Sequence, residues 1–249
     1  MAKKKKPKPS GKCALCLEEK TFAKSHIISK FHTRRLYKSK SGIVAFDKNG
    51  KRRPRQGGYW EHLLCVECDN QLGKNSEDYA AKVLFHAPQE LVTETKDGAV
   101  YKGIEESRFR EYLLTTLWRM SISRLDFFSD VDLGSEWNEI IRVGLFNRKS
   151  PERSIPVNIV RVFDNIGEPF NAIVNPRMRR NKNDEPSVVQ VLINGFLFDY
   201  QLDEISDSTD FSMLAEGTLS VANVYWWDIP WFKQGFDEAL KLGGLDYLR

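Results

Sequence analysis

The chain has 249 residues, of which 41% are hydrophobic and 29% are charged. This composition excludes a wholly disordered, collagenous or coiled-coil chain and is typical of a globular protein with one or two domains. The net charge of +4 is unevenly spread: residues 1–60 hold 18 Lys and Arg against 3 Asp and Glu, and the rest of the chain holds 20 against 31. Because a polycation attracts polyanions, we expect the N-terminal part to bind nucleic acid.

The sequence shows no sign of a secreted or membrane protein. No apolar run approaches the roughly 20 residues that a transmembrane helix needs, and no apolar signal-peptide core follows the N-terminal lysines. We therefore expect a soluble, cytoplasmic protein that makes no contact with a membrane.

Two pairs of cysteines follow a basic N-terminus. Residues 1–11 are rich in lysine and proline and are predicted to form a disordered tail. Cys13 and Cys16 then form one C-x-x-C pair, and Cys65 and Cys68 form another after 48 intervening residues. Since thiolates two residues apart can bind one ion from a tight turn, the pattern favours one structural Zn²⁺ over disulfides. Two redox dithiols or four unrelated buried thiols are the alternatives.

The zinc module is expected to span residues 12–88. Between the cysteine pairs we predict a short strand, a short basic helix and a hairpin, over residues 21–28, 31–37 and 43–52. After the second pair, the apolar spacing over residues 69–85 fits a helix, with Asp69 at its start and Gly73 as a weak point.

Residues 89–249 are expected to form a second domain, of unknown role, that could bind a protein partner or a second copy of the chain. Amphipathic helices are predicted over residues 105–125 and 135–145. A hairpin, four strands and a closing helix are predicted over residues 90–103, 155–163, 170–174, 188–200, 218–226 and 228–242. Helices followed by a run of strands imply an α+β domain with an antiparallel sheet.

One motif points to a family. The string SHII at residues 25–28 lies between the cysteine pairs, leucines precede the second pair, and Asp69 and Asn70 follow it directly. This order resembles the HNH endonucleases, whose zinc-bound treble-clef scaffold carries a ββα-metal site, in a variant with SHII in place of DHII. The resemblance covers about residues 13–80, a third of the chain.

The resemblance implies roles for single residues. His26 matches the catalytic histidine and is the candidate general base, because an imidazole with a pKa of about 6.5 can accept a proton at neutral pH. Asp69 matches the residue that opens the metal-site helix and, with Asn70, is a candidate ligand of catalytic Mg²⁺ or Mn²⁺. Ser25 stands where the family has a metal-binding Asp or His, and Glu77, near the same helix face as Asp69, is the candidate replacement.

Each of these residues also has a purely structural interpretation. His26 can be a packing histidine, Asp69 can cap its helix, and Glu77 can be a solvated helix residue. Trp60 stands where the family has an asparagine that restrains the loop before the second cysteine pair. That restraint must therefore come from another residue.

The same module carries a set of basic residues among aromatic side chains, which we expect to contact phosphate. They are Lys30, Arg34, Arg35, Lys51, Arg52, Arg53 and Arg55. The resemblance thus implies a metal-dependent endonuclease that cleaves DNA, in a restriction or phage-defence context. A non-catalytic zinc treble clef that only binds nucleic acid, and an HNH-type ribonuclease, are the alternatives.

Overall fold

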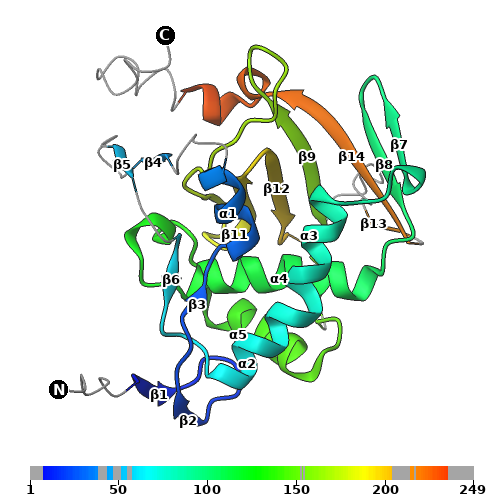
Figure 1. Ribbon diagram of the computed structural model, residues 1–249. Helices are drawn as coiled ribbons and strands as arrows, with labels where there is room; N and C mark the ends of the chain where they lie inside the picture. Colours follow the sequence, from blue (N-terminus) through cyan, green and yellow to red (C-terminus); the bar gives the residue numbers. More distant parts are fainter. Residues whose placement is uncertain are drawn as a thin grey trace, which may run out of the picture.

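The computed structural model describes residues 8–38, 44–46, 52–54, 58–151, 153, 155–203, 214–215 and 217–234. Within these ranges the chain combines one eight-stranded sheet, three two-stranded ribbons and several helices (Figure 1). The predicted α+β class with a largely antiparallel sheet is confirmed. None of the helices in this part of the chain combines the length and apolar composition that a bilayer crossing needs.

Short elements build the N-terminal part. They are β1 (Ser10–Lys12), β2 (Glu19–Thr21), β3 (Ser25–His26), α1 (Lys30–Lys38), β4 (Val44–Phe46), β5 (Arg52–Pro54) and β6 (Trp60–Glu61). The ribbons are β1–β2, β3–β6 and β4–β5, all antiparallel. The predicted basic helix and hairpin are therefore present, whereas the predicted strand over residues 21–28 shrinks to β3. Ser10 and Gly11, which we assigned to the tail, pair with β2 instead, and residues 1–7 lie outside the described ranges.

A continuous helical segment follows the second cysteine pair. It consists of α2 (Val66–Leu72), the π-helical turn η1 (Gly73–Glu77) and α3 (Asp78–Phe85). The predicted start at Asp69 is wrong by three residues, because Cys65 caps the helix: its Sγ accepts a hydrogen bond from the backbone N–H of Cys68. The interpretation of Asp69 as a helix cap is wrong for the same reason.

The large sheet has the strand order β10-β11-β12-β9-β14-β8-β7, and β13 pairs with β14. All pairs are antiparallel except β14–β9. The strands are β7 (Val92–Thr95), β8 (Gly98–Lys102), β9 (Val157–Phe163), β10 (Arg177–Arg180), β11 (Pro186–Ile193), β12 (Phe196–Gln201), β13 (Leu214–Ala215) and β14 (Thr218–Tyr225). The helical elements of this part are η2 (Gln89–Leu91), α4 (Glu106–Ile122), η3 (Asp126–Phe128), α5 (Gly134–Asn147) and η5 (Trp226–Asp228).

One predicted strand is a hairpin in the structure. Residues 188–200, which we predicted as a single strand, fold into β11 and β12 around Asn194 and Gly195, both with positive φ. Asn-Gly is the strongest short-range signal for a two-residue hairpin turn, so the sequence contained this information. The strand predicted over residues 170–174 contributes only one isolated bridge, between Ile173 and Ile193. Of the closing helix, residues 230–234 are helical and the remainder lies outside the described ranges.

The core joins the two predicted domains. One cluster of buried apolar side chains runs from Cys13 and Leu15 through α4 to the inner face of the large sheet. The hydroxyl of Tyr200 in β12 donates to the backbone carbonyl of Leu113 in α4, 3.1 Å away. The apolar stripe predicted for this helix is buried, as expected (Phe109, Leu113, Leu117 and Met120). Helix α4, at the centre of Figure 1, therefore lies between the sheet and the α2–α3 segment.

Candidate metal and catalytic sites

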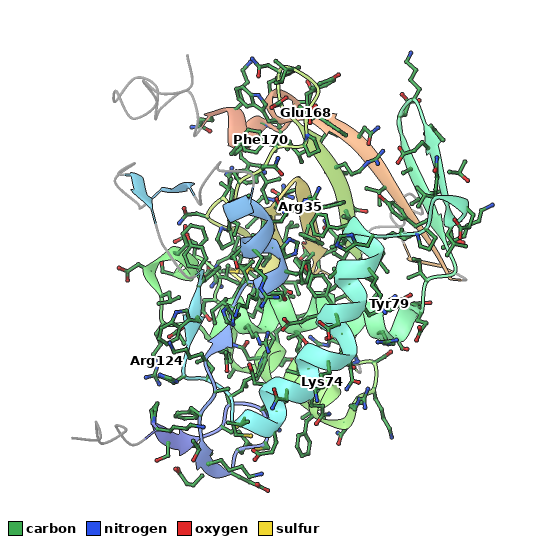
Figure 2. The ribbon with its side chains drawn as sticks, in the orientation of Figure 1. Arg35, Lys74, Tyr79, Arg124, Glu168 and Phe170 are labelled. Carbon is green, nitrogen blue, oxygen red and sulfur yellow. The ribbon has the colours of Figure 1, made fainter. Side chains whose placement is uncertain are left out.

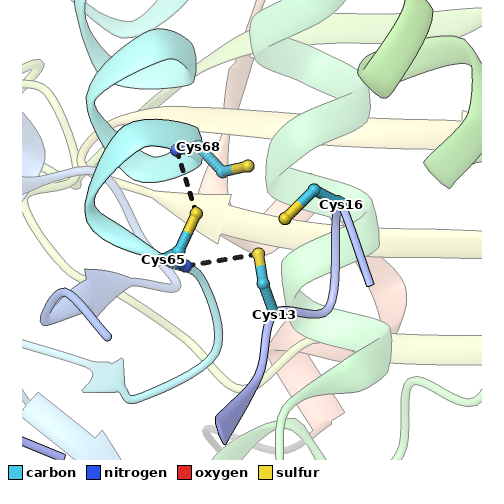
Figure 3. A group of neighbouring side chains, drawn as sticks. All are labelled: Cys13, Cys16, Cys65 and Cys68. Carbon is cyan, nitrogen blue, oxygen red and sulfur yellow. Dashed lines mark hydrogen bonds between the residues drawn. The ribbon is translucent and has the colours of Figure 1, made fainter. Parts of the chain in front are cut away.

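The four cysteines converge, as predicted. The four Sγ atoms all lie within 4.8 Å of one another, and Figure 3 shows the two pairs facing each other. Four thiolates at about 2.3 Å from one Zn²⁺ would lie about 3.8 Å apart, so a small adjustment of the side chains gives tetrahedral coordination. We call Cys13, Cys16, Cys65 and Cys68 the four-cysteine cluster; it can bind a metal ion such as zinc.

Burial and backbone hydrogen bonds act in opposite directions on the charge of the sulfurs. Burial raises the pKa of the Cys65 thiol to about 11 and also raises that of Cys68. The thiolates need a nearby positive charge, which a coordinated metal supplies. Backbone N–H groups already point at two sulfurs: Cys65 N donates to Cys13 Sγ at 3.2 Å, and Cys68 N donates to Cys65 Sγ at 3.5 Å.

His26 lies at the end of β3, opposite Trp60 of β6. Burial lowers the pKa of His26, and the nearby carboxylate of Glu77 partly opposes this effect. Since a lowered pKa leaves the imidazole neutral at pH 7, His26 has the protonation state that a general base needs.

Asp69 and Glu77 lie next to each other because of the π-helical turn. They are eight residues apart, which in a regular α-helix would rotate Glu77 by about 80° from Asp69. The turn adds one residue between them, marked by the bond from Asp78 N to Gly73 O, and so cancels most of that rotation. Gly73, which we predicted as the weak point of the helix, begins this turn.

Both carboxylates bind Arg119, a residue of α4 that sequence reasoning missed. Arg119 Nη1 donates to Glu77 Oε1 at 2.5 Å, and Nη2 donates to Asp69 Oδ1 at 3.3 Å. The same Nη1 donates to the backbone carbonyl of His26 at 3.0 Å. We call these four residues the Arg119 cluster.

The environment of Asp69 differs from that of an exposed carboxylate. Burial raises its pKa, an effect that the charge of Arg119 and a hydrogen bond with Ser25 partly oppose. Ser25 is itself buried, and its Oγ accepts a hydrogen bond from Leu64 N at 3.2 Å. Asn70, the third predicted ligand of a catalytic metal, is exposed to solvent. Among the described residues, only the four cysteines form a group of three or more His, Cys, Asp or Glu close enough to share an ion.

The loop before the second cysteine pair is restrained by the two residues after Trp60, Glu61 and His62. The Nδ1 atom of His62 lies 3.0 Å from the backbone carbonyl oxygen of Ala23, within hydrogen-bond distance. The carboxylate of Glu61 accepts hydrogen bonds from Ser123 Oγ and from the backbone N–H of Arg124, at the end of α4. Residues 61 and 62 are thereby held to Ala23, which precedes β3, and to the end of α4.

Basic side chains border the site on α1. Lys30, Arg34 and Arg35 are exposed, and the charge of Lys30 contributes to lowering the pKa of His26. Arg35, labelled in Figure 2, stacks over the ring of Phe85, 4.7 Å from its centroid. Residues Lys51 and Arg55 lie outside the described ranges, as do the side chains of Arg52 and Arg53.

Comparison of the chain with protein-family models, with curated proteins and with solved structures gives no match. Any function assigned to this chain therefore rests on its own residues. The strongest observations are the convergence of four cysteines and the convergence of His26, Asp69 and Glu77 on Arg119.

Proposed function

We propose that the protein is a metal-dependent endonuclease of the HNH type, with DNA as its substrate. The observation that carries the proposal is the Arg119 cluster, in which two candidate ligands and the backbone carbonyl of the candidate base bind one guanidinium beside a basic helix. The charges of both carboxylates also act on the His26 imidazole. Two further observations support the proposal: the antiparallel pair β3–β6 is followed by helix α2, the element order that a ββα-metal module would need, and the four-cysteine cluster could hold a structural zinc.

The proposed reaction is hydrolysis of a phosphodiester. His26 takes a proton from water, whose oxygen attacks phosphorus, and the bond to the leaving oxygen breaks as that oxygen gains a proton from solvent. Asp69 and Glu77 would hold a divalent cation, which would supply positive charge to neutralise the scissile phosphate. Lys30, Arg34 and Arg35 bind the flanking phosphates.

The test uses zinc-loaded full-length protein with plasmid DNA, single-stranded DNA or RNA, in Mg²⁺, Mn²⁺ or EDTA. We expect cleavage with metal only, and a loss of about 10²-fold to 10⁴-fold in His26→Ala. His86→Ala is the matched control, because His86 is an exposed histidine at the end of α3. Cleavage of RNA alone would instead indicate a ribonuclease.

One observation favours the second candidate, a non-catalytic zinc protein that binds nucleic acid. Arg119 already supplies a cation to both carboxylates, so these side chains are partly charge-compensated without a metal. Salt-dependent DNA binding together with no cleavage under any metal condition would establish this candidate in place of the first.

A further inference from the structure

Arg119 is unusual among the charged residues of this protein. Its residue exposure is 1%, and in the described part of the chain no other Lys, Arg, Asp or Glu is buried to that degree. A charged side chain is almost never fully buried unless it is paired. Arg119 can therefore be buried in the core only because it is paired.

The partners of Arg119 lie between it and solvent. The side chains of Asp69 and Glu77 are 23% and 15% exposed, against 2% for the side chain of Arg119. Arg119 binds one oxygen of each carboxylate, Oδ1 of Asp69 and Oε1 of Glu77. Each carboxylate thus keeps a second oxygen that Arg119 does not bind.

The charges of this group favour one added dication. Two carboxylates and one guanidinium leave a net charge of −1, and a single divalent ion changes it to +1, which complements the single negative charge of a phosphodiester. A guanidinium is planar with several fixed donors, so it can hold Asp69, Glu77 and the His26 carbonyl at once, whereas a lysine ammonium is a compact point charge.

The geometry points to Arg119 as a positioning residue of the proposed nuclease, one that orients Asp69 and Glu77 so that their remaining oxygens bind a single divalent cation. This inference rests on the proposed function but can be tested apart from it. It also makes α4, which belongs to the second predicted domain, part of the site. Partners outside the ligand shell typically change metal affinity by about 10-fold to 100-fold when they are replaced.

The experiment measures Mn²⁺ binding by electron paramagnetic resonance in zinc-loaded full-length protein without nucleic acid. We expect one Mn²⁺ per chain in wild type and at least about tenfold weaker binding in Arg119→Lys. Arg110→Lys is the matched control, because Arg110 lies on the same helix but pairs with Glu106 near the surface. Zinc content and circular dichroism report whether each variant is folded. Glu77→Gln is the second variant, and its Mn²⁺ affinity should also fall at least about tenfold.

Each result decides the inference. It is overturned if wild type binds no Mn²⁺, if folded Arg119→Lys binds Mn²⁺ as tightly as wild type or more tightly, or if Glu77→Gln retains wild-type affinity. Tighter binding in Arg119→Lys would mean that the guanidinium competes with the metal. A wild type that binds Mn²⁺ through these residues but cleaves nothing would support the positioning role and reject the nuclease, whereas cleavage with unchanged Mn²⁺ binding in Arg119→Lys would do the reverse.

Discussion

The four-cysteine cluster and the Arg119 cluster share helix α2 but are assembled over different distances along the chain. The cysteines come in two pairs, each within four residues, so only one tertiary contact is needed to complete the cluster. The Arg119 cluster joins β3, two positions of the α2–η1 segment, and a side chain of α4 that lies 42 positions beyond Glu77. A local spacing thus defines the first site, whereas only the packed tertiary structure defines the second.

The largest expected effect breaks the four-cysteine cluster. Cys65→Ser removes one ligand and the helix-capping sulfur together, and since zinc-binding free energy is folding free energy, the cost is on the order of 10 kcal/mol. Elemental analysis should fall from about one zinc per chain to nearly none, with loss of the folded far-ultraviolet spectrum. The control Glu19→Gln changes an exposed residue of β2, three residues after Cys16, and should keep its zinc.

The next effect breaks the Arg119 cluster. Arg119→Met keeps the apolar stem but leaves two partly buried carboxylates without their cation, which should lower the free energy of unfolding by about 3 to 5 kcal/mol. Urea unfolding measures this loss, and zinc content should stay near one per chain. Arg110→Met, on the same helix, should cost less than about 1 kcal/mol. Equal losses in the two variants would show that the buried ion pairs of Arg119 contribute no more to stability than the surface ion pair of Arg110.

A third prediction concerns acid and the core where α1 packs on α4 and the large sheet. His32 of α1 is fully buried, its Nε2 lies 2.8 Å from the Tyr112 hydroxyl, and burial lowers its pKa to about 3. The unfolded chain therefore binds one more proton than the folded chain between pH 6.5 and 3, so this histidine makes stability fall as pH falls. The loss should be about 2 kcal/mol at pH 5 relative to neutral pH.

His32→Gln isolates this contribution from the other titrating groups. The difference in unfolding free energy between pH 7 and pH 5, measured with urea, should shrink by about 2 kcal/mol in the variant. An unchanged difference would show that His32 is not buried in its neutral form.

The smallest predicted effect concerns the link between β6 and the end of α4. Glu61→Gln weakens the bonds from Ser123 and Arg124 and should lower the free energy of unfolding by about 1 kcal/mol, with zinc retained. Glu90→Gln, an exposed substitution in η2, should stay within about 0.5 kcal/mol of wild type. A loss as large as that of Arg119→Met would mean that β6 contributes more to the free energy of unfolding than these hydrogen bonds indicate.

The sequence predicted what depends on local patterns. The cysteine spacing and the apolar stripe of α4 each carry their structural meaning within a few residues, and both predictions are confirmed. The hairpin predicted over residues 90–103 is also present, as β7 and β8. The helix start at Asp69 failed because a cysteine sulfur acts as the cap, which composition alone does not reveal. The π-helical turn also has no local signature beyond Gly73.

Arg119 could have been found from the sequence. It is the only charged residue between Glu111 and Arg124, in the middle of a run that is otherwise apolar or neutral. A single charge on the buried face of a helix requires a partner of opposite charge. The pattern predicts that an acidic partner exists but cannot identify it. Asp69 and Glu77 lie on a distant segment, and the π-helical turn determines that both lie on the same face of it.

The position of Arg119 along the chain also determines when the Arg119 cluster can form during synthesis. The ribosome produces the N-terminal segments first, so both cysteine pairs and the His26 strand emerge before α4 exists. Until about residue 122 has left the exit tunnel, the two carboxylates of the α2–η1 segment lack their guanidinium partner. A nascent or prematurely terminated chain can therefore bind zinc without presenting a complete Arg119 cluster, and the cell would meet the assembled site only on chains that have been translated beyond α4.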